Sequence, residues 1–226
     1  MERHGREGLD ESQKQKLWAV LERHHTAFAA SPSDVGQTQF VQHNINTGDA
    51  VPIRQHAWCL PHSRQLAAEQ CLKEMKAAGV IEPTERPLAS PVVLVPKKDG
   101  NWRFCVDFQR LNNVTVKDFY PLPRIDESLD QIAGSQWFSS LDLRSGYWQV
   151  PLFAHARPKT AFTTGSGLWQ FKTMPFVLCN APATFERLME QVLQGVPKEA
   201  CLVYLDDLLV HGNQNHGHTL TWSSPE

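Results

Sequence analysis

Hydrophobic residues recur at helical spacing in four stretches of the chain, and each stretch predicts a helix. The first runs from about residue 10 to 29 and begins with Asp10 and Gln13, which form a capping pair. The second ends at Gly79, the third spans about 123–133 and the fourth about 181–193. The apolar positions behind these predictions are Leu17, Leu21 and Phe28, then Ala68, Leu72 and Met75, then Ile125, Leu129 and Ile132, and finally Phe185, Leu188, Met189 and Val192.

Short apolar or alternating runs predict strands elsewhere in the chain. Two of the predicted hairpins turn at glycine-containing segments, residues 97–101 and 165–167. The expected strands lie at residues 92–95, 102–106, 137–141, 161–163, 169–171, 201–205 and 208–211. Together the elements predict an α+β fold, in which helices pack against a sheet that follows an N-terminal extension.

The composition narrows the class of protein without identifying it. The chain has 226 residues, of which 41% are hydrophobic, and a formal net charge of −2. That is enough apolar material for one substantial core or two small ones. No apolar run is long enough to cross a bilayer and residues 1–5 carry no apolar signal segment, so we expect a soluble intracellular protein, cytoplasmic or nuclear, that is neither secreted nor membrane-bound. The five cysteines form no Cys-x-x-Cys pair, which favours neither disulfides nor zinc.

Three aspartates are the first candidates for chemistry. Asp206 and Asp207 lie between apolar runs, where two adjacent carboxylates repel each other and resist burial. An exposed hairpin turn and a divalent-cation site both explain the pair. Asp142 closes a predicted strand just before a glycine-containing loop. It is either a cap or turn residue or a third metal ligand, since aspartates of this kind hold paired cations in phosphoryl transfer.

A local excess of positive charge surrounds the first hairpin. The segment from Lys97 to Arg124 contains six basic and three acidic residues, a local net charge of +3. A solvated face is the ordinary explanation for such a stretch. Its significance depends on the motifs nearby.

Several motifs, in this order along the chain, resemble the reverse transcriptases of long-terminal-repeat retrotransposons, in particular the gypsy/Ty3-like elements. The similarity runs from about residue 38 to 211 and rests on Lys97-Lys98-Asp99-Gly100, Ser139-Ser140-Leu141-Asp142-Leu143-Arg144-Ser145-Gly146-Tyr147, Pro158-Lys159-Thr160-Ala161-Phe162, Met174-Pro175-Phe176, Asn180-Ala181-Pro182-Ala183-Thr184-Phe185 and Tyr204-Leu205-Asp206-Asp207.

The resemblance implies the fingers and palm subdomains of a right-hand polymerase, with helices on one face of the palm sheet. It places the fingers at about 38–122 and 151–173 and the palm at about 123–150 and 174–211. Residues 1–37 are then a helical extension and linker, and residues 212–226 are a divergent tail that we expect to be disordered. The thumb, connection, ribonuclease H and integrase regions of a Pol polyprotein are expected to be absent from this chain.

The resemblance also implies an activity, RNA-directed DNA polymerisation, and roles for individual residues. A primer 3′-hydroxyl attacks the α-phosphate of a dNTP on an RNA or DNA template, and two Mg²⁺ ions, or Mn²⁺ as an alternative, assist the transfer. The metal ligands are Asp142, Asp206 and Asp207, with the Leu143 carbonyl. The expected nucleotide-binding residues are Lys97, Arg103, Arg144, Tyr147, Phe176 and Val177, and the expected template or primer contacts are Asn180, Pro182 and Tyr204. Tyr147 is expected to crowd the sugar 2′ position.

Two positions depart from the family pattern. Val177 stands where the family has glycine, which is unfavourable if that backbone needs a positive φ or a close approach to nucleotide or template. Gln109 stands where the family usually has arginine. Val177 and the missing thumb motivate the first alternative to a polymerase, a truncated or degenerate fragment without catalysis that keeps nucleic-acid or partner binding. The second is an unrelated two-metal nuclease.

Overall fold

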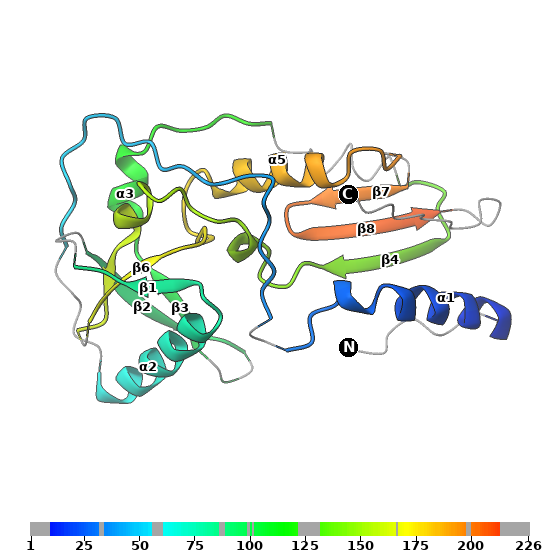
Figure 1. Ribbon diagram of the computed structural model, residues 1–226, viewed down its shortest axis with the longest axis horizontal. Coiled ribbons are helices and arrows are strands. Elements are labelled where there is room, and N and C mark those ends of the chain that lie inside the picture. Colours follow the sequence, from blue (N-terminus) through cyan, green and yellow to red (C-terminus); the bar gives the residue numbers. More distant parts are fainter. Residues whose placement is uncertain are drawn as a thin grey trace. The chain divides into compact units, whose positions relative to one another are not determined.

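The computed structural model describes residues 10–31, 34–55, 61–85, 89–98, 100, 102–121, 132–165, 167–197 and 200–212 (Figure 1). Nearly all of the helix predicted at 123–133, and the tail beyond Gly212, lie outside these residues. The chain forms two compact units, Met1–Asp34 and Val35–Glu226. Among the described residues no helix is both long and apolar enough to span a membrane.

The first unit contains helix α1 (Glu11–Arg23), followed by a 3-10 turn η1 (His25–Ala27). The predicted capping pair is confirmed: Gln13 N donates to Asp10 Oδ1 over 2.7 Å, and Asp10 N donates to Gln13 Oε1 over 2.9 Å. This reciprocal pair satisfies two of the backbone amides that a helix start leaves free. The α-helix ends six residues before the predicted limit of residue 29, and it buries none of its side chains.

The first helix of the second unit is α2 (His62–Ala77), which buries Ala68, Leu72 and Met75 as the sequence pattern predicts. Gly79 follows it with φ of +70°, and Val80 N donates to Met75 O over 2.9 Å. Glycine adopts this left-handed conformation without the steric cost that a Cβ would bring, so it ends the helix as expected.

A five-stranded sheet follows in the order β1-β6-β5-β2-β3. Its strands are β1 (Ile81–Pro83), β2 (Ser90–Pro96), β3 (Trp102–Val106), β5 (Phe162–Thr163) and β6 (Leu168–Phe171). All neighbours are antiparallel except β2 and β5. Both predicted hairpins are confirmed, and β5 and β6 join strands that precede them by more than fifty residues in the chain.

A second sheet has three antiparallel strands in the order β4-β8-β7. They are β4 (Trp137–Asp142), β7 (Cys201–Tyr204) and β8 (Asp207–Gly212), all at predicted positions. Figure 1 shows helix α5 (Ala181–Val192) running beside this sheet. Phe185, Leu188 and Met189 of α5 share a buried cluster with Leu208 of β8.

The α+β class is confirmed, but the strands form two separate sheets. Four short elements were not predicted: strand β1, helix α3 (Gln109–Val114), and the 3-10 turns η2 (Gly146–Gln149) and η3 (Arg157–Thr160). Elements of three to six residues are too short for a hydrophobic period to be read from them.

Candidate active site

The register of the small sheet brings the distant aspartates together. Asp142, the last residue of β4, lies directly opposite Asp207, the first residue of β8. Leu143 N donates to Asp206 O over 3.2 Å, which continues the alignment one step beyond the ladder. Directly opposed residues in an antiparallel pair have Cβ atoms about 4.5–5.5 Å apart and point to the same face. The backbone therefore places the Asp142 side chain beside that of Asp207.

These side chains lie on the open face of the sheet. Side chains alternate along a strand, so Asp142 and Asp207 point away from the face that carries Leu208. Leu208 is 9% exposed and belongs to the core cluster that includes α5, whereas Asp142 and Asp207 are exposed. The hydrophobic flanks of the aspartates thus build one face of the sheet while leaving the carboxylates accessible on the other.

Two unusual backbone conformations flank the acidic pair. Leu205, between Tyr204 and Asp206, has φ of 56°, and Ser145, three residues after Asp142, has φ of 49°. Among the described residues these are the only non-glycine positions with positive φ. Such a conformation costs about 1–2 kcal/mol for an L-residue and concentrates at functional sites.

Tyr147 is held close to the carboxylates by aromatic stacking. Its ring stacks on Phe185 of α5 with centroids 5.0 Å apart and an interplanar angle of 24°. Burial, followed by the negative charge of Asp206, raises the pKa of the Tyr147 hydroxyl. A Cβ on the adjacent Gly146 would lie 2.9 Å from the Phe185 ring, so glycine permits this approach of η2 to α5.

The acidic face suits a cation that is shared with a substrate. Magnesium prefers carboxylate oxygens and is commonly bound by one or two of them, with water and substrate phosphates completing the shell. No three His, Cys, Asp or Glu side chains in the described ranges are grouped so as to hold an ion by themselves. The opposed Asp142 and Asp207, with Asp206 adjacent, therefore fit a site open to substrate oxygens and do not form a closed protein cage.

The basic candidates lie on the β2–β3 hairpin. Lys97 directly follows β2 and Arg103 pairs in register with Val95 of that strand, and both cations are exposed. Gly100, with φ of +82°, donates its N–H to Lys97 O over 3.2 Å and closes the turn. The hairpin thus presents two solvated positive charges. Arg144, beside the acidic strand end, is also exposed.

The loop that carries Phe176 and Val177 joins the larger sheet to α5. Phe176 is 43% exposed, while Val177 is half-buried against the core. Val177 is not among the residues with positive φ. The first condition under which valine would be unfavourable here, a positive φ, is therefore not met, because this backbone is accessible to β-branched residues. Gln109 begins α3, and its N–H donates to Asp107 Oδ1 over 2.9 Å.

The three expected template contacts differ in their surroundings. Tyr204 is 39% exposed and lies opposite Asp207, on the acidic face. Pro182 is half-buried in the first turn of α5. Asn180 is only 9% exposed, and both ends of its amide bond to backbone atoms of residues 116–118. Its side chain holds two segments of the protein together.

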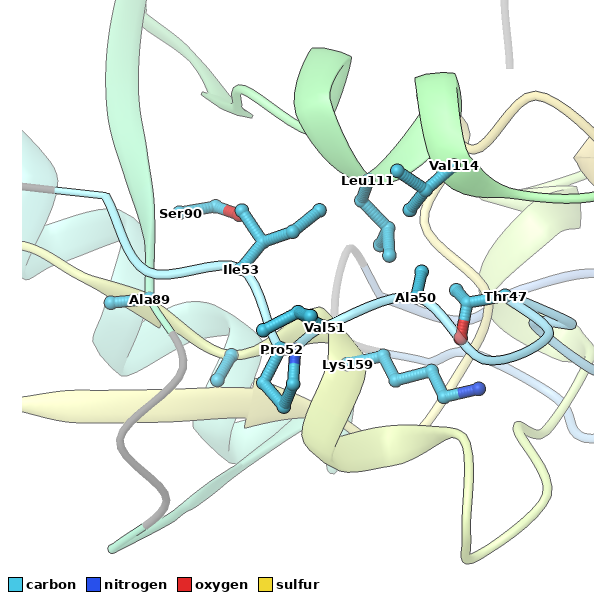
Figure 2. Close-up of a pocket in the computed structure, with 11 residues that line it drawn as sticks. Thr47, Ala50, Val51, Pro52, Ile53, Ala89, Ser90, Leu111, Val114 and Lys159 are labelled. Carbon is cyan, nitrogen blue, oxygen red and sulfur yellow. The ribbon is translucent and has the colours of Figure 1, made fainter.

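Two pockets lie apart from the aspartates. The first, of about 110 Å³, is mainly apolar: Leu111 and Val114 of α3 approach it from one side, and Pro52 and Ile53 line it together with Lys159 (Figure 2). The second, of about 410 Å³, includes Asn180 among its lining residues. Neither is lined by Asp142, Asp206 or Asp207. An extended ligand would reach the carboxylates across the sheet face and would not need either pocket.

Sequence reasoning missed several residues that shape the site, namely Asn112, Ser145, Gly146, Phe185 and Leu205. Gly146 and Phe185 belong to recognised motifs, so a signal for them existed, but their mutual contact is a tertiary feature. Asn112, whose amide bonds to the Val177 carbonyl and the Cys179 N–H, carried no sequence signal.

Comparison with known proteins identifies the family of this chain. The family of reverse transcriptases (RNA-dependent DNA polymerases) matches residues 95–224, which extends beyond the expected end of the similarity at residue 211. The chain is 33% identical over 207 residues to the retrovirus-related Pol polyprotein from transposon 297 of Drosophila melanogaster, covering 89% of this chain and 20% of that protein. It is 46% identical over 119 residues to an RNA-directed DNA polymerase homolog of Oenothera berteroana, covering 51% and 84%.

Among solved structures, the foamy viral protease–reverse transcriptase in complex with an RNA/DNA hybrid superposes with a TM-score of 0.83. The identity is 22%, and the match covers 92% of this chain and 28% of that one. At that identity the likeness shows the shared fold. The chain spans about a fifth of the length of the retrotransposon polyprotein that it matches.

Proposed function

Because this chain belongs to the reverse transcriptase (RNA-dependent DNA polymerase) family, we propose that it forms the fingers and palm of an RNA-directed DNA polymerase from a retroelement Pol polyprotein. In the proposed reaction, at Asp142, Asp206 and Asp207, the primer 3′-hydroxyl forms a bond to the α-phosphorus of a dNTP, and the bond from that phosphorus to the β-phosphate breaks with release of pyrophosphate. The observation that carries the proposal is the register that sets Asp142 opposite Asp207 on the open sheet face. Two aspartates from separate motifs, Asp142 and Asp207, thereby lie side by side, and Asp206 directly precedes Asp207 in the chain.

The aspartates are proposed to hold two Mg²⁺ ions, or Mn²⁺, together with the Leu143 carbonyl. When bound, such ions neutralise charge on the attacking and leaving oxygens of the phosphoryl group. The chain itself contributes position, since the ladder between β4 and β8 holds Asp142 and Asp207 before any substrate arrives. Preorganised charge of this kind needs little rearrangement during the reaction.

The nucleotide is proposed to lie between the acidic face and the fingers hairpin. Lys97 and Arg103 are proposed to grip its triphosphate, because an ammonium and a planar guanidinium complement phosphate oxygens and both are exposed. Arg144, Phe176 and Val177 complete the proposed pocket.

Tyr147 is proposed to crowd the sugar 2′ position and so to favour deoxyribonucleotides. Its stacking on Phe185 and its proximity to the Asp206 charge support this role. A ring held from behind by a buried aromatic cannot swing away from an additional hydroxyl without disturbing the core.

The proposed partner is an RNA or DNA template with its primer, lying along the open face that carries Tyr204. The similar foamy viral protein was solved with an RNA/DNA hybrid. Contacts to the phosphate backbone should make this binding weaken with salt. Thumb and ribonuclease H regions of a longer polyprotein are further proposed partners in the full enzyme.

Primer extension tests the proposal. The purified chain is incubated with Mg²⁺, dNTPs and a labelled DNA primer on an RNA template, beside an Asp206→Asn/Asp207→Asn variant. Extension by the wild type and none by the variant is the expected result. Equal signals from both proteins would reject catalysis at these residues.

The two alternatives give distinct results in the same assay. A chain that retains the labelled duplex in a filter-binding measurement but never extends it would be a non-catalytic fragment. Shortening of the labelled strand that requires Asp142, without nucleotide addition, would indicate a nuclease.

A further inference from the structure

The amide of Asn112 bonds to the backbone of the Phe176–Val177 loop at two points. Its Nδ2 donates to Val177 O over 2.8 Å, and its Oδ1 accepts from Cys179 N over 3.0 Å. An acceptor and a donor two residues apart are the pair that one strand offers to its neighbour in a sheet. The side chain therefore acts on this loop as a one-residue strand.

Asn180, at the C-terminal end of the loop, makes the same pair of hydrogen bonds, but here the side chain belongs to the loop and the backbone belongs to the segment after α3. Its Nδ2 donates to Val116 O over 2.7 Å, and its Oδ1 accepts from Asp118 N over 3.1 Å. Again a carbonyl and an N–H two residues apart are satisfied by one amide. The α3 region thus binds the loop, and the loop's end binds the segment that follows α3.

Further contacts fix that segment along α5. Arg187 forms an ion pair of 2.5 Å with Asp118, and its guanidinium lies 5.0 Å from the Tyr120 ring centroid. The Tyr120 hydroxyl donates to Glu190. The Arg187 hydrogen bond holds the pKa of the Asp118 carboxyl below its usual value. The anchor of the loop is therefore tied to the same helix that supports Tyr147 through Phe185.

The loop has few internal restraints of comparable quality. Its own backbone contributes a bond from Leu178 N to Pro175 O at 3.3 Å and one from Ala181 N to Leu178 O at 3.1 Å. Both Asn112 hydrogen bonds, at 2.8 and 3.0 Å, are shorter than these two backbone bonds. Phe176, whose side chain is 43% exposed, immediately precedes the carbonyl that Asn112 holds.

We propose that Asn112 is a positioning residue for the incoming nucleotide: it holds the Val177–Cys179 backbone so that Phe176 and Val177 form the wall of the nucleotide pocket. It does so without touching the substrate. This inference rests on the proposed polymerase function. It adds a residue from α3, outside the motifs that identify the family in this chain.

The test compares Asn112→Ala with Asn113→Ala, because Asn113 is an exposed asparagine on the same short helix. The first measurement is the rate of amide hydrogen exchange at Cys179, which nuclear magnetic resonance monitors in the full chain. Loss of this partly buried hydrogen bond should speed the exchange about tenfold in Asn112→Ala, and Asn113→Ala should match the wild type. The Asp118 amide, which Asn180 holds, is the internal reference.

The second measurement is the dissociation constant of a fluorescent dNTP on a template-primer with a dideoxy end, in Mg²⁺. We expect Asn112→Ala to raise this constant about tenfold, and Asn113→Ala to leave it unchanged. Asn112→Asp covers the case in which the alanine variant does not fold. Its carboxylate still accepts from Cys179 N but cannot donate to Val177 O, so Cys179 exchange should stay slow while dNTP binding weakens.

Cys179 exchange at the wild-type rate in Asn112→Ala would overturn the proposal. So would faster exchange with an unchanged dNTP dissociation constant, since the loop would then be held without consequence for the nucleotide. A wild-type chain that binds no dNTP would reject the polymerase function and with it the role of Asn112 in nucleotide binding. The exchange rates would still show whether Asn112 holds the loop.

Discussion

The two sheets use similar apolar sequences for different ends. In the five-stranded sheet, four of the first five residues of β2 are buried, and Val92 and Leu94 are each under 4% exposed. In the three-stranded sheet, five of the six residues of β4 are exposed, including Phe138 at 50% and Leu141 at 44%. Strand β2 is thus enclosed in the core over most of its length, while the smaller sheet is covered on the α5 side and exposes Asp142 and Asp207 on the other.

The difference separates stability from chemistry. A strand buried on both faces cannot carry charge without a large desolvation cost, so the buried part of β2 is suited to support. The open face can hold Asp142 and Asp207 side by side because both side chains are exposed to water. Substitutions in the two sheets should therefore affect different measurements.

The largest effect is expected from Asp142→Asn on the open face. Primer extension should fall about 10³-fold or more, equivalent to roughly 4 kcal/mol of lost transition-state stabilisation. The urea midpoint should stay the same or rise slightly, because a like charge opposite Asp207 is removed. Asp49→Asn, at an exposed carboxylate outside the candidate site, is the matched control and should retain full extension. A large loss of stability in Asp142→Asn would contradict the view that the open face serves chemistry and contributes little to stability.

In the enclosed sheet, Phe162→Ala should act on stability instead. Phe162 is fully buried and its ring contacts those of Phe104 and Phe171, with centroids 5.6 and 5.3 Å away. Removing it leaves a cavity that should cost about 3 kcal/mol or more in the free energy of unfolding. Urea denaturation followed by circular dichroism measures this change. A loss under about 1 kcal/mol would mean that the surroundings collapse into the space.

Gly146→Ala tests the packing contact between η2, the turn that follows β4, and helix α5. The added methyl group would lie 2.9 Å from the Phe185 ring, which is 1% exposed and cannot move freely. Overpacking of this kind should cost about 1–3 kcal/mol and displace Tyr147. Gly36→Ala is the control, because a Cβ there meets nothing within 4 Å. If Phe185→Leu in the same chain restores stability, the clash is with that ring.

The last expected effect is a loss of stability in mild acid due to His43, which hydrogen-bonds to Thr184 of α5. The side chain is 2% exposed, and Nδ1 lies 2.8 Å from Thr184 Oγ1. Burial, and then the charge of Arg187, lowers the pKa of His43 from 6.5 to about 4, while Asp118 opposes the shift. Between pH 6.5 and pH 4 the His43 side chain is therefore protonated in the unfolded chain but neutral in the folded chain. The free energy of unfolding consequently falls as the pH drops toward 4.

Between pH 7.5 and pH 5.0 this linkage should remove about 2 kcal/mol from the free energy of unfolding. Urea titrations at the two pH values measure it. His43→Gln should lose this part of the pH dependence, whereas His155→Gln, at an exposed histidine, should keep it. An unchanged pH dependence in His43→Gln would assign the acid sensitivity to other groups.

Local patterns were enough to predict most of the regular elements. Helix α2 with its buried face and its Gly79 terminus, the β2–β3 hairpin and the amphipathic helix α5 were all predicted within a few residues. Their signals are spacing, turn residues and caps, which depend on neighbours in the chain. Family motifs added the acidic site and the α+β fingers and palm, because those residues are recognised by type and order.

The division into two sheets and the pairing of β2 with β5 came only from the tertiary structure. So did the approach of Gly146 to Phe185 and the two asparagine bonds that hold the Phe176 loop, and so did the ordinary φ at Val177. Hydrophobic period and turn chemistry are local properties, whereas these features join residues far apart in the chain. That a residue is asparagine does not predict which backbone groups its side-chain amide will hydrogen-bond. The sequence alone determined which residues could do the chemistry, and the packing of distant segments decided how they are held.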